Sequence, residues 1–163
     1  MTNKQRVYAL CAAEPSGDLQ ASALVPHIRQ LDPEARIIGI GGRHLAAQGV
    51  ELLCDTSCWG SIGPSEVVAR LPRIIIDYYR FRAKYAAIAP DVTVMIDSPA
   101  LFMRMAKYTK KRGLKTIYYF PPSAWSTSHR RMREIADRVT GVVPTFRRNY
   151  ETYRDAQVPV EFF

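Results

Sequence analysis

The stretch ALCAAEPSGDLQAS, residues 9–22, decides the fold. Its apolar part belongs to a run that predicts a buried strand over residues 6–12. A turn with two carboxylates, Glu14 and Asp18, follows, and helix-forming residues then predict a helix over 17–32. A strand that leads through a short turn into a helix begins a βαβ unit, from which parallel sheets are built.

The same alternation continues along the chain and predicts a doubly wound parallel α/β sheet of the Rossmann-like kind. The 163 residues are enough for one domain with a real core. We expect Pro26 to kink the first helix and Pro72 to restart a later one. The further strands are expected at 35–42, 50–53, 91–97, 115–120 and 138–143, the further helices at 43–50, 64–89, 99–113, 128–137 and 145–155, and one more strand at the closing VPVEFF.

Composition and charge narrow the class of protein. The chain is 47% hydrophobic and 23% charged, without a run of about 20 apolar residues and without a signal peptide pattern in MTNKQRVYAL. Three cysteines without further zinc ligands predict free thiols in a reducing cytoplasm and no metal site. The net charge of +8 suits an anionic partner or plain solubility. Scattered charges and the lack of a recognised motif argue against nucleic acid.

Ligands of such sheets bind beyond the carboxyl ends of the strands, where four segments converge: 14–18, 39–43, 97–99 and 121–128. The first turn has a single glycine, Gly17, and neither a G-x-G-x-x-G nor a Walker A pattern. Its two carboxylates would repel a pyrophosphate, so we expect neither NAD nor ATP there. Either Ser16 or Asp18 caps the helix, or the turn accepts hydrogen bonds from sugar hydroxyls.

Three other segments each allow a functional and a structural interpretation. Asp97 ends a very apolar strand, so it is either a general base or an N-cap of the next helix. The segment YYFPPSAWSTSHRR (118–131) suits a sugar or phosphate site, or is a rigid surface loop, and His129 is not expected to bind metal. The helical segment 65–85 is both apolar and basic, so it lies at a membrane surface or covers the sheet.

Six motifs together resemble the lipid A disaccharide synthase family, in order and rough spacing, over nearly the whole chain. They are AAEPSGD (12–18), IIGIGG (37–42), SEVVARLPRI (65–74), PDVTVMIDSP (90–99), YYFPPSAW (118–125) and VVPTF (142–146).

The resemblance implies the N-terminal domain of a GT-B glycosyltransferase, an inverting hexosyltransferase that needs neither metal nor cofactor. Such an enzyme joins UDP-2,3-diacylglucosamine to 2,3-diacylglucosamine 1-phosphate and releases UDP, at the cytoplasmic face of the inner membrane. Residues 1–163 would be the acceptor side, and the UDP-sugar would be held by a C-terminal domain absent from this chain.

The resemblance also assigns roles. Asp97 would be the catalytic base. Substrate would contact Glu14, Ser16, Gly17, Asp18, Gly41, Gly42, Ser98, Ser123, Trp125 and Arg131, the last through a phosphate. An anionic membrane surface would contact Val67, Val68, Leu71, Ile74, Ile75 and Tyr78.

Three positions depart from the family pattern: Pro15 replaces a threonine, Ala100 an aspartate and Thr127 a tryptophan. They leave open a relative with another acceptor, or a sugar- or lipid-binding module of the same fold without catalysis.

Overall fold

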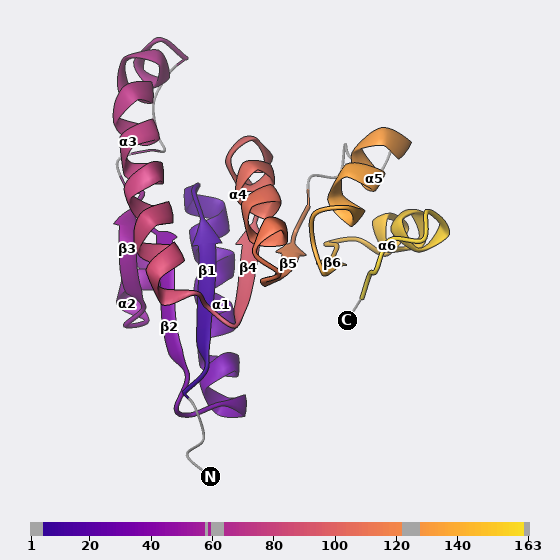
Figure 1. The fold of residues 1–163 in the computed structure, drawn as a ribbon, viewed down its shortest axis with the longest axis horizontal. Helices are drawn as coiled ribbons and strands as arrows, with labels where there is room; N and C mark the ends of the chain where they lie inside the picture. The colour runs from indigo at the N-terminus through magenta and orange to yellow at the C-terminus, as the bar shows by residue number, and fades with distance from the viewer. Residues whose placement is uncertain (1–4, 58, 60–63, 122–127, 162–163) are drawn as a thin grey trace.

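The structure is a computed structural model of the chain and describes residues 5–57, 59, 64–121 and 128–161. Strands and helices alternate in it as predicted (Figure 1). The elements are β1 Val7–Ala12, α1 Pro15–Leu31, β2 Arg36–Gly41, α2 Arg43–Ala47, β3 Glu51–Asp55, α3 Pro64–Ile88, β4 Val92–Ile96, α4 Pro99–Lys111, β5 Lys115–Tyr119, α5 His129–Ala136, β6 Gly141–Val143 and α6 Arg147–Asp155.

The strands form one parallel sheet in the order β3-β2-β1-β4-β5-β6. This confirms the predicted doubly wound α/β fold, in which the chain leaves β1 towards one edge and returns beside it at β4. One core cluster packs α1 and α2 against one face, and a larger one packs α3 to α6 against the other. Both faces are therefore covered, which explains why β1 and β4 are nearly all apolar.

Two local expectations were wrong. Helix α1 runs through Pro26, within the range predicted for it, but α3 also runs unbroken through Pro72, so Pro72 does not restart a helix. The hydrogen bond lost at each proline is offset by apolar side chains that the helix buries beyond it, Tyr78 and Phe81 in the case of α3. The described part of the last predicted strand, up to residue 161, makes a single bridge, between Val142 and Val160.

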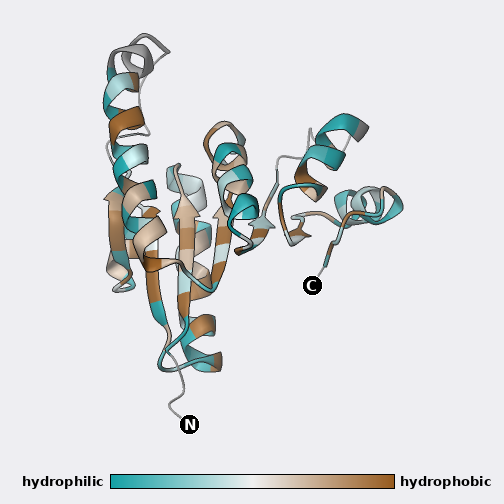
Figure 2. Ribbon diagram, in the orientation of Figure 1, coloured by the Kyte–Doolittle hydropathy of each residue, from teal (hydrophilic) through white to brown (hydrophobic). Residues whose placement is uncertain are grey.

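Helix α3 is much longer than the strands that it covers. Its 25 residues span about 37 Å at 1.5 Å per residue, and the two strands that it connects have five residues each. Because its end at Ile88 lies near the start of β4, its first half projects beyond the carboxyl ends of the strands (Figure 1). The projecting part carries a strongly hydrophobic turn (Figure 2).

Candidate active site

The candidate site lies at the topological switch point, where β1 and β4 are neighbours and their helices cover opposite faces of the sheet. Glu14 follows β1, and Asp97 and Ser98 follow β4. The hydroxyl of Ser98 donates a hydrogen bond to Glu14 Oε1 at 3.0 Å, which joins the two strand ends. The sequence therefore predicted correctly that these three residues come together.

The turn after β4 has an uncommon backbone. Asp97 and Ser98 both lie in the left-handed region, with φ of 53° and 43°. For residues other than glycine this conformation costs roughly 1–2 kcal/mol each, and such strain gathers at functional sites. Ser98 is the N-cap of α4 and makes no side-chain capping bond. Asp97 is therefore not the helix cap that the alternative interpretation expected.

A buried tyrosine holds this turn in place. The hydroxyl of Tyr118, on the neighbouring strand β5, donates a hydrogen bond to the backbone carbonyl oxygen of Asp97 at 2.6 Å. Burial raises the pKa of Tyr118 far above its ordinary value, and the nearby charge of Asp97 adds to the rise. The hydroxyl is therefore a neutral donor throughout the physiological pH range.

Asp97 lines a cavity of about 200 Å³, which we call the switch-point cavity. Among the described residues, none donates a hydrogen bond to its half-buried carboxylate. Such a carboxylate can accept a proton from a bound hydroxyl. The cavity is lined by the predicted Ser16, Gly17 and Asp97, and by Gln20, Ile96, Phe120 and Thr145, which sequence analysis missed.

Two of the missed lining residues, Phe120 and Thr145, could have been predicted from their positions in the sequence. Phe120 follows β5 and Thr145 lies two residues after β6, and both positions obey the rule that ligands meet the carboxyl ends of parallel strands. Gln20 and the hydroxyl contact of Tyr118 carry no such signal, because their places depend on how neighbouring elements pack.

Asp18 has a different environment from the other acid of the first turn. Its side chain is 2% exposed, and its oxygens accept hydrogen bonds from the backbone N–H groups of Gly42 and His44, each at 2.8 Å, and of Leu45 at 3.3 Å. It thus caps α2 from another element, and it does not cap its own helix as one interpretation expected. The Asp18 carboxylate, which was predicted to bind sugar hydroxyls, instead binds these three backbone N–H groups.

Gly41 and Gly42, predicted to contact substrate, allow this close approach. A Cβ at Gly41 would collide with Leu45 Cδ1 and lie 2.9 Å from Asp18 Oδ1, and one at Gly42 would lie 3.1 Å from Asp18 Oδ2. A second cavity, of about 360 Å³, adjoins them and is lined by Pro15, Asp18, Gly42, Arg43, His44, Thr56 and Ser57.

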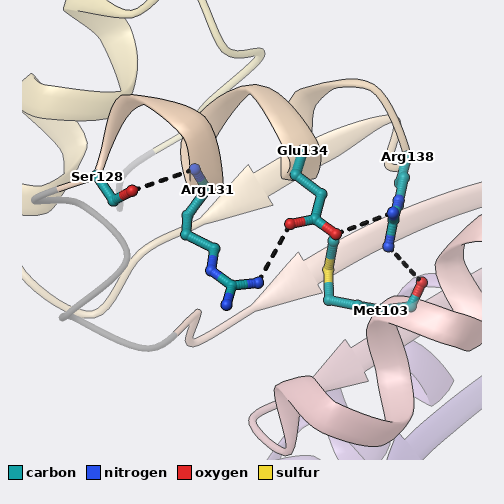
Figure 3. Close-up of polar contacts among 5 residues, drawn as sticks. All are labelled: Met103, Ser128, Arg131, Glu134 and Arg138. Carbon is teal, nitrogen blue, oxygen red and sulfur yellow. Dashed lines mark hydrogen bonds and ion pairs between the residues drawn. The ribbon is translucent and has the colours of Figure 1, made fainter.

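Arg131 lies on α5 and lines neither cavity. Its guanidinium contacts Glu134 at 3.3 Å, and its backbone N–H is accepted by Ser128 Oγ at 3.4 Å (Figure 3). Glu134 also pairs with Arg138 at 2.9 Å, and Arg138 donates to the carbonyl of Met103 on α4. These contacts fasten α5 to α4. Ser123 and Trp125, which were predicted to contact substrate together with Arg131, lie outside the described residues.

The residues predicted to contact a membrane divide into three groups. Leu71 and Ile75 are 47% and 44% exposed, and Ile74 is partly buried. Tyr78 is 7% exposed and packs in the core, so its assignment was wrong, because it lies on the face of α3 that covers the sheet. The side chains of Val67 and Val68 lie outside the part that the structure describes.

Two features are absent from the described residues. No helix among them is long and apolar enough to cross a membrane. No three His, Cys, Asp or Glu side chains of that part of the chain are placed to hold a metal ion together.

Solved structures with this fold include UGT73P12 from Glycyrrhiza uralensis, in complex with glycyrrhetinic acid 3-O-monoglucuronide. The TM-score is 0.65 and the identity 8%, over 96% of this chain and 48% of that one. A protein from Listeria monocytogenes described as a UDP-N-acetylglucosamine 2-epimerase gives a TM-score of 0.59 at 9% identity, over 94% and 43% of the two chains. At such low identity these likenesses show the fold alone.

Sequence relatives are more specific. Lipid-A-disaccharide synthase 1 of Legionella pneumophila (strain Paris) is 35% identical over 163 residues, which cover 99% of this chain and 42% of the relative. The Geobacter metallireducens lipid-A-disaccharide synthase is 36% identical over 153 residues, 94% of this chain and 40% of the relative. The chain thus spans about two fifths of the length of these relatives. The family described as lipid-A-disaccharide synthetase matches residues 8–163. The chain belongs to the lipid-A-disaccharide synthetase family.

Proposed function

We propose that this chain is the acceptor-side domain of an inverting glycosyltransferase of the GT-B type. The enzyme joins UDP-2,3-diacylglucosamine to 2,3-diacylglucosamine 1-phosphate and releases UDP. One observation carries the proposal beyond family membership: Asp97 lines a cavity at the switch point of the sheet, and no described residue donates a hydrogen bond to its carboxylate.

In the proposed reaction, Asp97 acts as general base. Its carboxylate takes the proton of the acceptor hydroxyl, whose oxygen attacks the anomeric carbon of the donor sugar. The bond from that carbon to the UDP oxygen breaks on the opposite face, so the configuration inverts in one displacement. Ser16 and Gln20, on the same cavity, orient the acceptor by hydrogen bonds.

The donor is assigned to a second domain, for which the greater length of the relatives leaves room. The backbone N–H groups that start α2 would be the natural phosphate binders on this side of the sheet. Asp18 already uses three of them. This supports a division in which the present chain binds the sugar acceptor and leaves the diphosphate to the partner domain.

The lipid substrates require a surface that meets the membrane, and we assign this role to the exposed face of α3. Leu71, Ile75 and Tyr79 follow one another at four-residue spacing on the projecting helix, and each is about half exposed. Arg73 and Arg80 flank them, with 73% and 69% of their side chains exposed, although both approach Asp77. An apolar stripe with basic borders suits docking to the inner face of the inner membrane.

The test of the reaction uses the full-length protein with the two lipid sugars. We expect a disaccharide and stoichiometric UDP, identified by mass spectrometry, with inverted anomeric configuration by NMR. Tight binding of the acceptor without any product would instead favour a binding module of the same fold.

The test of docking is co-sedimentation with vesicles. We expect the chain to bind anionic vesicles more than neutral ones, with salt weakening the binding. The double change Ile75→Ser and Tyr79→Ser should remove the salt-resistant part, at about 25 cal/mol per Å² of buried surface. Leu31→Ser, at the exposed far end of α1, is the matched control and should bind like the wild type. Wild-type protein that stays in the supernatant at low salt would refute docking, and equal binding to duplex DNA would favour a nonspecific charge effect.

A further inference from the structure

Tyr118 is buried on β5 and yet reaches the candidate site through its hydroxyl. In the sheet register it stands opposite Met95, two residues before Asp97. Its hydroxyl passes along β4 and donates to the Asp97 carbonyl oxygen at 2.6 Å. The side chain is fully buried, and Tyr118 is not among the described residues that line the switch-point cavity.

The bond acts on the peptide group between the two strained residues. The carbonyl of Asp97 belongs to the peptide plane that joins Asp97 to Ser98, and both residues have positive φ. Holding this plane restrains the ψ angle of Asp97 and therefore the direction of its Cα–Cβ bond, from which the carboxylate extends. It also fixes Ser98, whose hydroxyl reaches Glu14 and whose carbonyl accepts the N–H groups of Leu101 and Phe102.

We propose that Tyr118 is a positioning residue: its hydroxyl holds the left-handed Asp97–Ser98 turn so that the Asp97 carboxylate faces the acceptor. This rests on the proposed function, in which Asp97 is the base. A well-oriented base is worth far more than the same group free to rotate, and a misplacement of 1 Å can cost about 100-fold in rate. The release of one hydrogen bond is a smaller disturbance, so the expected loss is about tenfold.

The test compares two isosteric changes in the full-length enzyme. Tyr118→Phe removes the hydroxyl that holds the turn. Tyr153→Phe is the matched control, because Tyr153 is equally buried nearby and its hydroxyl has no hydrogen-bond partner in the part of the chain that the structure describes. We expect kcat to fall about tenfold for Tyr118→Phe with KM within about twofold, and no change for Tyr153→Phe.

A double-mutant cycle with Asp97→Asn separates a positioning role of Tyr118 from an effect on general stability. In the Asp97→Asn background, Tyr118→Phe should leave kcat unchanged, because no base remains to be oriented. Equal losses in both backgrounds, or a Tyr118→Phe enzyme as active as Tyr153→Phe, would overturn the proposal. Near-normal kcat in the single Asp97→Asn variant would instead refute the base, and so the proposed mechanism itself.

Hydrogen exchange supplies a readout that does not depend on activity. The amides of Leu101 and Phe102 bond to the Ser98 carbonyl, so they should exchange faster when the turn loosens. We expect faster exchange at these two amides in Tyr118→Phe and not in Tyr153→Phe. Unchanged exchange would contradict the role of Tyr118 even if the activity fell.

Discussion

Asp18 and Asp97 lie at the same edge of one sheet, but their carboxylates differ in burial and in hydrogen bonding. Asp18 is buried, and three backbone N–H groups bind its carboxylate. Asp97 is half-buried beside a cavity, with no hydrogen bond to its carboxylate from any described residue. In the Asp97 region, the surrounding bonds hold the backbone and leave the side chain available.

The difference shows that carboxylates at one edge of a sheet can have separate roles, one in stability and, in the proposed mechanism, one in catalysis. A buried carboxylate is tolerated only with good partners, so Asp18 must serve the structure that encloses it. A carboxylate that reacts needs an open lone pair and a fixed direction. Removing the two charges should therefore have separable effects, on stability for Asp18 and on turnover for Asp97.

The largest expected effect is on turnover. Asp97→Asn in the full-length enzyme should lower kcat on the order of 10²–10⁴-fold, as for other general bases. Asparagine adopts positive φ more readily than most residues, so the turn should persist and the unfolding midpoint in urea should not move. A variant that is folded and nearly as active as the wild type, or one that is unfolded, would break the comparison.

The next effect is on stability. Asp18→Asn keeps one acceptor oxygen but turns an NH₂ group towards a backbone donor. We expect a loss of about 2–3 kcal/mol in the free energy of unfolding, measured by urea denaturation of the chain. Asp137→Asn, an exposed carboxylate after α5, should change stability by less than about 0.5 kcal/mol. Equal stability of the two variants would show that the three backbone contacts of Asp18 contribute little.

The smallest expected effect concerns the nucleotide. Because Asp18 occupies the amides at the start of α2, the chain should bind UDP with a Kd no tighter than about 1 mM. Isothermal titration calorimetry measures this directly. Micromolar binding of UDP to residues 1–163 would mean that the region around Asp18 and the start of α2 also binds ligands.

The amino-acid sequence determined most of the fold. Apolar runs of strand length, separated by amphipathic stretches, placed the strands and helices near their observed bounds, because hydrophobic periodicity follows directly from which face is buried. It failed at Pro72, where α3 continues because packing outweighs a missing hydrogen bond. It also failed in the closing segment, of whose described residues Val160 alone bridges to the sheet.

The sequence also determined which chemistry gathers at the strand ends, since parallel strands put their carboxyl ends at one edge. Only the tertiary structure decided which carboxylate stabilises the fold and which one stays available to a ligand. Both Glu14 and Asp18 stand in one turn, yet Asp18 points to the next βα turn and Glu14 to Ser98, 84 residues along the chain. The same holds for Tyr118, whose contact joins neighbouring strands. Such partners are set by the register and packing of elements distant in sequence, and no local pattern of residues encodes them.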